Sequence, residues 1–260
     1  MAFGGIKEIQ RDLTIATIFF TRVPLRYRGE IGPKDLSRAL RCLPFVGLGI
    51  GLASAGLAAL ALWAGAPPLL AALLAVGGSI LLTGCFHEDG LTDLADGFGG
   101  AFERQRKLEI MKDSRTGTYG AAALILSIAI RAAALAAVIE AGALWAVLPV
   151  AHILGRTVIP GFMAVTPQAN TTGLASYHEP PRGAVLWTAL GGGVLLTLLL
   201  AGPGLGLGPA LGLILAAAAA ALALRWLALR QIQGYTGDVL GAAEQLAEMA
   251  VLSVAAMLHS

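Results

Sequence analysis

Residues 117–139 read GTYGAAALILSIAIRAAALAAVI, a run in which Arg131 is the single charged residue. Crossing a bilayer as a helix takes about 20 predominantly apolar residues, so this run predicts a membrane-spanning helix. Six more stretches meet the same criterion, at 42–64, 68–84, 143–165, 184–202, 208–229 and 239–257. The sequence therefore predicts an all-α, polytopic membrane bundle of about seven transmembrane helices, or six if the last stretch, which Glu244 and Glu248 interrupt, does not cross.

The composition agrees with a lipid environment. Of the 260 residues, 57% are hydrophobic and only 13% are charged, whereas soluble domains carry roughly 25% charged residues. The net charge is only +2, which excludes the concentrated basic face of a nucleic-acid-binding protein. We expect residues 1–260 to form a single integral-membrane domain.

The basic residues predict the orientation, because cytoplasmic loops retain Lys and Arg. Sixteen of the 18 fall before the first span, in the loop after the second, or at the other connections on that same side. This pattern predicts a multi-pass protein of the inner membrane with a cytoplasmic N-terminus, and an external C-terminus if there are seven spans. It also predicts that segments 85–116, 166–183 and 230–238 meet at the cytoplasmic surface. Residues 12–24, apolar and then basic, suit a helix lying in the interface.

The acidic residues gather in the motif HEDGLTDLADG at 87–97. If this segment is helical, Asp89, Asp93 and Asp96 share one face at i, i+4 and i+7. Like charges at that spacing repel, and hard carboxylate oxygens suit Mg²⁺, Mn²⁺ or Ca²⁺. A solvated acidic helix is the alternative. The position of the motif directly after a membrane span favours a metal site.

Other residues of this motif have different expected roles. His87 lies off the carboxylate face, where we expect it to pack or to support a ligand. Gly90 and Gly97 would leave backbone bare on a neighbouring face, where a bulky substrate could approach.

Residues 104–120, RQRKLEIMKDSRTGTYG, combine cations, hydroxyls and glycine. Lys112 and Arg115 can neutralise phosphate oxygens, Ser114 offers a hydroxyl, and Gly117 permits close backbone approach. The alternative is a positively charged anchor at the mouth of the third span. The neighbouring acidic motif favours phosphate binding.

Two other places carry polar groups at or inside spans. Arg156, one turn from His152, is a second candidate for a phosphate contact, because a lone Arg in a span needs a partner or an aqueous cavity. His152 is equally a satisfied core residue. Asp238, in GYTGDVLGA at 234–242, could complete the metal shell, orient a substrate hydroxyl, or simply stabilise a helix N-terminus.

Three ordered motifs, at 87–97, 108–120 and 236–242, resemble the cobalamin synthase family, the adenosylcobinamide-GDP ribazoletransferases. The resemblance extends to Phe20–Pro24, Pro44–Gly47 and Gly173-Leu174. It implies transfer of α-ribazole, or its 5′-phosphate, onto adenosylcobinamide-GDP with Mg²⁺, releasing GMP and forming adenosylcobalamin or its phosphate.

The residues are expected to divide this chemistry among them, with 85–116 as the catalytic loop between the second and third spans. The candidates are Asp89, Asp93 and Asp96 for the metal, Glu88, Lys112, Ser114, Arg115 and Arg156 for substrate, and Asp113 or Asp238 as general base. Association into a homo-oligomer or with other cobalamin enzymes is left open.

Two other classes of membrane protein share some of these features. CDP-alcohol phosphotransferases also use Asp-rich membrane helices and a metal, but Leu91-Thr92 does not match the residues that follow their first Asp-Gly. A cation or proton carrier is prompted by Arg131, Glu244 and Glu248 inside spans, where we expect Arg131 to pair with one of the two acids. Carriers place such groups near the midplane, whereas the acidic motif here lies in a surface loop.

Overall fold

The computed structural model describes residues 5–169 and 180–258, and the regular structure in these ranges is helical. The helices are α1 (Ile6–Phe20), α2 (Pro33–Ala39), η1 (Leu40–Cys42), α3 (Leu43–Trp63), α4 (Pro68–Thr83), α5 (Phe86–Gly100), α6 (Arg104–Ile110), α7 (Thr118–Glu140), α8 (Leu144–Val165), α9 (Gly183–Leu205), α10 (Leu207–Ile232) and α11 (Gly237–Leu258). The predicted Gly173-Leu174 and part of the segment 166–183 lie outside the described residues.

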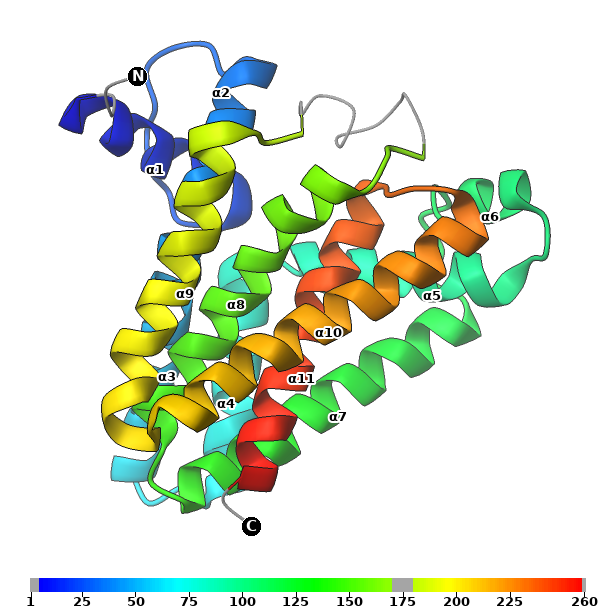
Figure 1. Cartoon of the computed structure of the whole chain (residues 1–260). Coiled ribbons are helices and arrows are strands. Elements are labelled where there is room, and N and C mark those ends of the chain that lie inside the picture. Colours follow the sequence, from blue (N-terminus) through cyan, green and yellow to red (C-terminus); the bar gives the residue numbers. More distant parts are fainter. Residues whose placement is uncertain (1–4, 170–179, 259–260) are drawn as a thin grey trace.

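The long helices form the predicted bundle (Figure 1). Within the described ranges, six helices are long and apolar enough to cross a membrane, namely α3, α7, α8, α9, α10 and α11. α4 is shorter and is followed by α5 at a bend of 91°. We treat α4 as a seventh crossing and α5 as a helix that lies outside the spans. All seven helices lie within a few residues of the predicted stretches.

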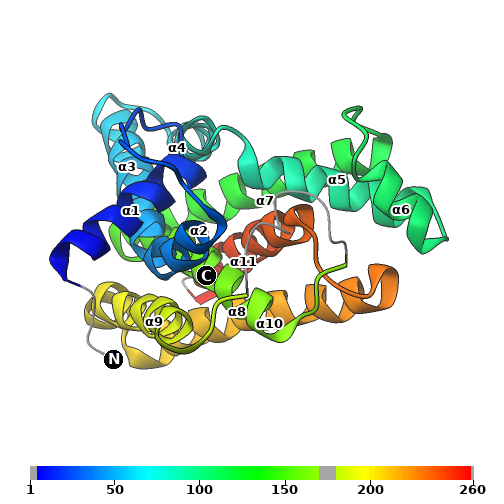
Figure 2. The same ribbon diagram turned by 90° about the horizontal axis from the view of Figure 1, so that it is seen from above.

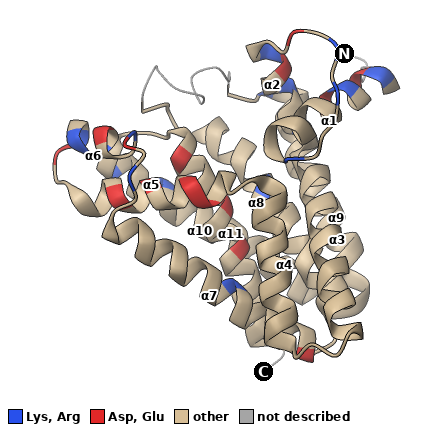
Figure 3. Cartoon of the chain, turned by 180° about the vertical axis from the view of Figure 1, so that it is seen from behind, with Lys and Arg blue, Asp and Glu red and all other residues tan. Residues whose placement is uncertain are grey.

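Most of the charged residues lie at one end of the bundle (Figure 3). We call this the polar end; it carries α1, α2, α5, α6 and the α10–α11 connection. The connections α3–α4, α7–α8 and α9–α10 lie at the opposite end, together with the end of α11 (Figure 1). The two ends of the described chain are therefore on opposite sides, as an odd number of crossings requires.

α8 and α11 form the centre of the bundle, and α11 lies between α7 and α10 when the molecule is seen from above (Figure 2). α3 packs closely on α8, because a Cβ at Gly51 would lie 2.5 Å from Pro149 Cα. Small residues at such crossings let helix backbones approach in lipid. The buried apolar side chains include Leu135, Val147 and Val251.

The N-terminal segment forms a hooked pair of helices at the polar end. α1 begins at Ile6, earlier than the predicted 12–24, and the short helix α2 was not predicted. Asp12 of α1 is fully buried. Its carboxylate accepts a hydrogen bond from Arg38 Nε at 2.9 Å and forms an ion pair with Arg41 Nη2 at 2.7 Å. These ion pairs fix α1 over the start of α3.

Candidate active site

The acidic motif forms α5, which begins after a sharp turn. Gly84 and Cys85 both adopt left-handed backbone, with φ of +66° and +60°. The turn directs α5 across the end of α4, so that Leu91 and Leu94 are buried. Asp89 is exposed and Asp93 is partly exposed. The apolar face of the helix therefore fixes which carboxylates face outward.

α5 crosses the start of α11 with almost no space between the backbones. A Cβ at Gly90 would lie 2.9 Å from the carbonyl oxygen of Asp238 and 3.2 Å from Gly241 Cα. A Cβ at Gly97 would likewise lie 3.0 Å from the Lys107 carbonyl oxygen. The expectation that these two glycines leave backbone open to a substrate was wrong, because they serve close helix packing.

This crossing brings Asp238 to the carboxylates of α5. Thr236 donates a hydrogen bond to Asp238 Oδ2 at 3.1 Å and accepts one from Val239 N at 3.3 Å, which orders the first turn of α11. Burial, and then the neighbouring carboxylates of Asp89, Asp238 and Asp96, raise the pKa of Asp93 to about 7. Sequence analysis grouped the three acids of α5 and offered Asp238 as one residue that could complete the metal shell, and the structure places Asp238 near Asp93.

Several carboxylates lie near Asp93, although within the described ranges no three of them have ligand atoms that all lie within 4.8 Å of one another. Burial is the first cause of the raised pKa of Asp93, and the like charges of its neighbours add to it, so part of the shift comes from negative charge that the protein does not compensate. Asp89 and Asp93 offer oxygen atoms at an accessible surface, which are the ligands Mg²⁺ and Mn²⁺ prefer. The donor set on the outer face of α5 therefore suits the predicted metal.

Asp96 has a different set of partners. Its two carboxylate oxygens accept the backbone N–H groups of Gly117 at 2.6 Å and Gly120 at 2.8 Å, at the start of α7. A Cβ at Gly117 would lie 2.5 Å from this carboxylate. The space beside the Gly117 backbone is therefore occupied by the Asp96 carboxylate and not open to a phosphate. A metal role for Asp96 stays a prediction that these hydrogen bonds do not support.

The predicted phosphate-binding residues Lys112, Ser114 and Arg115 lie exposed in the loop between α6 and α7. Arg115 Nη2 pairs with Asp113 Oδ2 at 2.7 Å. The hydrogen bond from the Arg115 side chain holds the pKa of Asp113 at about 2. A general base works best with a pKa near the working pH, so this environment disfavours Asp113 in that role.

The three segments predicted to meet at one surface do meet in their described parts. Arg104 donates to the carbonyl oxygen of Ile232 at 2.9 Å and to that of Ala169 at 2.6 Å. Tyr235 N donates to the Pro167 carbonyl oxygen at 2.9 Å. One arginine of the loop 85–116 therefore joins the other two segments around the polar end.

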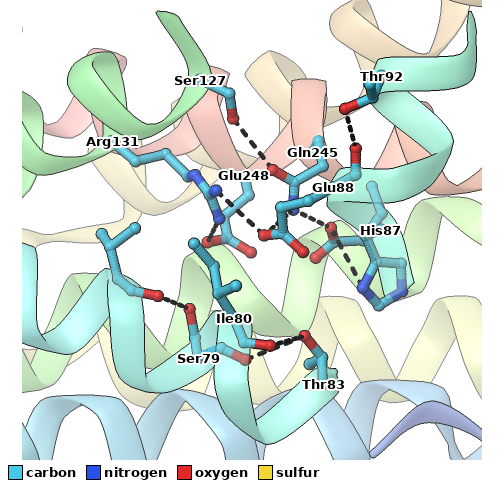
Figure 4. A network of polar contacts seen from close by, with 12 residues as sticks. Ser79, Ile80, Thr83, His87, Glu88, Thr92, Ser127, Arg131, Gln245 and Glu248 are labelled. Carbon is cyan, nitrogen blue, oxygen red and sulfur yellow. Dashed lines mark hydrogen bonds and ion pairs between the residues drawn. The ribbon is translucent and has the colours of Figure 1, made fainter. Parts of the chain in front are cut away.

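Glu88 points away from the carboxylates of the surface, into the bundle (Figure 4). Its Oε1 accepts hydrogen bonds from Arg131 Nη2 and from Gln245 Nε2, each at 3.1 Å. Arg131 also contacts Glu248 at 3.4 Å, which confirms Glu248 as one of the two predicted partners. Glu88 is only 4% exposed, so its predicted contact with substrate has no support in this arrangement. Its place in the motif is structural.

Arg156 is buried among acids as well. Its Nη1 contacts Glu244 Oε1 and lies 3.1 Å from Glu248 Oε2. His152, Glu244 and Glu248 are the one group of three among the described residues whose ligand atoms lie within 4.8 Å of one another. Because the guanidinium already supplies positive charge there, this group does not need a metal. The predicted phosphate contact of Arg156 is likewise not supported by its position.

Comparison with known proteins gives a consistent family. The family model for cobalamin-5-phosphate synthase matches residues 12–256. The chain belongs to this family. An adenosylcobinamide-GDP ribazoletransferase of Bradyrhizobium diazoefficiens is 44% identical over 96% of this chain and 95% of its own length. One of Mesorhizobium japonicum is 41% identical over 96% and 95%. No solved structure matches.

The cobalamin-5-phosphate synthase match confirms the resemblance that the three motifs indicated. It favours that family over both the CDP-alcohol phosphotransferase and the carrier alternatives. The charges inside the spans, which prompted the carrier, are instead partners of one another and of Glu88.

Sequence reasoning missed several residues around the site of this cobalamin-5-phosphate synthase family member. Gln245 joins Glu88 to Glu244 by donating at 3.1 and 2.9 Å, and it accepts Ser127 Oγ at 3.1 Å. Lys107 donates to Gln231 across α6 and α10. The i, i+3 spacing of Gln245 and Glu248 on one helix face could have indicated that Gln245 belongs to the buried polar network. No local sequence pattern indicated the contact between Lys107 and Gln231.

Proposed function

We propose that this protein transfers α-ribazole, or its 5′-phosphate, onto adenosylcobinamide-GDP, releasing GMP and forming adenosylcobalamin or its 5′-phosphate. The names of the relatives support the substrates. The observation that carries the proposal is the close crossing of α5 and α11, which brings Asp238 near the carboxylates of Asp89 and Asp93. A cluster of carboxylates at an accessible surface suits a reaction at a pyrophosphate that needs a divalent metal.

The reaction joins a ribose hydroxyl to a pyrophosphate phosphorus. A new P–O bond forms, the bond to the GMP oxygen breaks, and the hydroxyl proton must be accepted by the protein or water. We assign Asp89 and Asp93 to hold Mg²⁺, or Mn²⁺ in its place. When bound, the metal would neutralise negative charge on the phosphoryl oxygens.

The other residues position substrate and move the proton. Asp238, partly exposed beside Asp89, is the better candidate for the proton acceptor, since Asp113 is held by Arg115 with a low pKa. Lys112, Ser114 and Arg115, in the exposed loop before α7, are proposed contacts for the pyrophosphate. Glu88 and Arg156 are assigned instead to the buried network.

We place the polar end on the cytoplasmic side of the inner membrane, in keeping with its excess of Lys and Arg. Both substrates and the leaving GMP are large and polar, which suits a site that opens to the cytoplasm. Assembly with itself or with other cobalamin enzymes stays a prediction.

The test uses purified protein in detergent with adenosylcobinamide-GDP, α-ribazole and Mg²⁺, and measures GMP by chromatography. We expect GMP release that EDTA abolishes and Mg²⁺ restores. Asp238→Asn should lower kcat by about a hundredfold or more, whereas Asp113→Asn should stay within about tenfold of wild type. Folded wild-type protein that releases no GMP would overturn the proposal, and equal losses in both variants would overturn the role of Asp238.

A further inference from the structure

A hollow lined by basic side chains lies at the polar end, where α2 faces the start of α9 (Figure 1). We call it the basic hollow. Its volume is about 590 Å³, within the range of about 300–1,000 Å³ typical of small-molecule sites. None of the residues assigned above to the metal or to the substrates is among the described residues that line it. Lys34, Ser37 and Arg38 line it from α2, and Pro181, Arg182 and Val185 line it from the other side.

The positive charge of the basic hollow is only partly compensated. Arg38 Nε pairs with the buried Asp12 at 2.9 Å, and Arg38 Nη2 lies 3.4 Å from Asp35. Lys34 and Arg182 are both exposed, and neither forms an ion pair or a side-chain hydrogen bond with a residue in the described ranges. Two uncompensated cations therefore lie on two sides of one hollow, an arrangement that suits an anionic group.

The basic hollow lies at the boundary between a membrane and water. Arg182 directly precedes α9, which is one of the six helices long and apolar enough to cross a membrane. Trp187, in the first turns of α9, is 69% exposed, and tryptophan is enriched where a span meets the lipid headgroups. On the other side α1 packs against α2, and its exposed Ile6 and Ile9 suit a helix that lies in the interface. The cations of the basic hollow are therefore placed among the headgroups.

We propose that the basic hollow binds the phosphate of an anionic phospholipid. Lys34 and Arg182 would hold the phosphate oxygens from two sides, and Arg38 would add part of its charge. The acyl chains would run along the exposed apolar side chains of α9, among them Leu195 and Leu199. Basic pockets beside membrane-spanning helices bind acidic headgroups in this way. Lipid binding here is independent of the proposed function, because it involves no group of the reaction.

Other ligands that carry phosphate fit the basic hollow less well. The proposed metal residues Asp89 and Asp93 lie on α5, which is on the opposite side of the polar end from α9 when the molecule is seen from above (Figure 2). A free phosphate would meet the two cations but would gain nothing from the apolar surface of α9. Phosphatidylcholine would place its own cation beside Lys34 and Arg182, where like charges repel. An anionic lipid satisfies both the charges and the apolar surface.

The test compares Lys34→Gln and Arg182→Gln with wild type, and uses Arg230→Gln as a matched control. Arg230 is an exposed arginine near the end of α10 and is not among the residues that line the basic hollow. Delipidated protein in detergent is titrated with phosphatidylglycerol, phosphatidylcholine or inorganic phosphate. The rise in Tm with ligand concentration gives the Kd for each, and native mass spectrometry counts the bound lipids.

Wild type should bind phosphatidylglycerol in a saturable manner, and more tightly than phosphatidylcholine or inorganic phosphate. Lys34→Gln and Arg182→Gln should each raise the Kd for phosphatidylglycerol about fivefold, because each removes the attraction of one cation near the membrane surface. The Kd of Arg230→Gln should stay within twofold of wild type. Both substituted side chains of the basic hollow are exposed, so we expect these variants to fold, and their Tm without lipid checks this.

Three results would overturn the proposal. The first is an unchanged Kd for phosphatidylglycerol in both folded variants of the basic hollow. The second is an equal rise in Kd for Arg230→Gln, which would show that the lipid responds only to the general charge of the polar end. The third is wild type that binds inorganic phosphate as tightly as phosphatidylglycerol, which would assign the basic hollow to a free anion. None of these measurements involves GMP release, so each would leave the proposed function intact.

Discussion

Glu88 Oε1 lies 3.1 Å from Arg131 Nη2 in the interior of the bundle, although the next residue, Asp89, is exposed. Two adjacent acids of one motif thus face different environments. The inward acid joins α5 to α7 and α11, while the outward acid belongs to the surface cluster.

This division predicts opposite effects of neighbouring substitutions. Glu88→Ala should lower the free energy of unfolding by about 3–5 kcal/mol, because it leaves the Arg131 charge buried with less compensation. Asp89→Ala should leave the stability of the metal-free protein within about 0.5 kcal/mol and abolish activity. Denaturant unfolding in detergent measures the first effect and GMP release the second. Equal stability of the two variants would contradict the structural role of Glu88.

Asp96 should act on the start of α7. Asp96→Ala removes both acceptors for the N–H groups of Gly117 and Gly120, and loss of such a cap costs about 1–2 kcal/mol. Hydrogen exchange at residues 117–121 should speed up, while exchange at the middle of α7 stays unchanged. Unaltered exchange at 117–121 would show that the cap does not form.

The packing of α5 on α11 predicts intolerance of a single methyl group at Gly90. Gly90→Ala should destabilise the protein by about 1–3 kcal/mol, since the added Cβ meets backbone that cannot move aside easily. Gly49 on α3 is the matched control, because nothing lies within 4 Å of a Cβ built there. Gly49→Ala should be neutral or slightly stabilising. The Tm of each variant in detergent measures this difference. Similar Tm values for Gly90→Ala and Gly49→Ala would contradict the close packing of α5 on α11.

The raised pKa of Asp93 predicts a pH dependence of the metal-free protein. With a folded pKa of about 7 above an unfolded value of about 3.9, the folded state holds this proton more tightly. Its stabilising contribution is present at low pH and is lost as pH rises toward 7. The gain in Tm from Asp93→Asn should therefore be larger at pH 8 than at pH 5. A gain in Tm that does not depend on pH would show that the pKa of Asp93 is not raised in the folded protein.

The sequence predicted the fold well because long apolar runs leave little choice in lipid. Each of the seven predicted stretches corresponds to a helix. It did not predict the bend after Thr83, where Gly84 and Cys85 adopt left-handed backbone, nor the pairing of Asp12 with Arg38. Both depend on contacts between segments rather than on local composition.

The structure shows where the candidate residues lie, whereas their roles in metal binding and catalysis stay predictions. Helical spacing put Asp89 and Asp93 on one face, which is accessible in the structure, and the position of Asp238 at the mouth of the last span suggested it as a neighbour. Helical spacing could not show that Asp96 accepts hydrogen bonds from the first N–H groups of α7. Nor could it show that other parts of the protein pack against the backbone of Gly90 and Gly117. These features require knowing which helix packs against which.

The most direct measurement of the central claim is a titration of Mn²⁺ into purified protein, followed by electron paramagnetic resonance of the free ion. Wild type should bind Mn²⁺, and Mg²⁺ should compete for the same site. Asp89→Asn and Asp93→Asn should each weaken binding about tenfold or more, whereas Asp113→Asn should leave it unchanged. Undiminished Mn²⁺ binding in folded Asp89→Asn and Asp93→Asn proteins would contradict the claim.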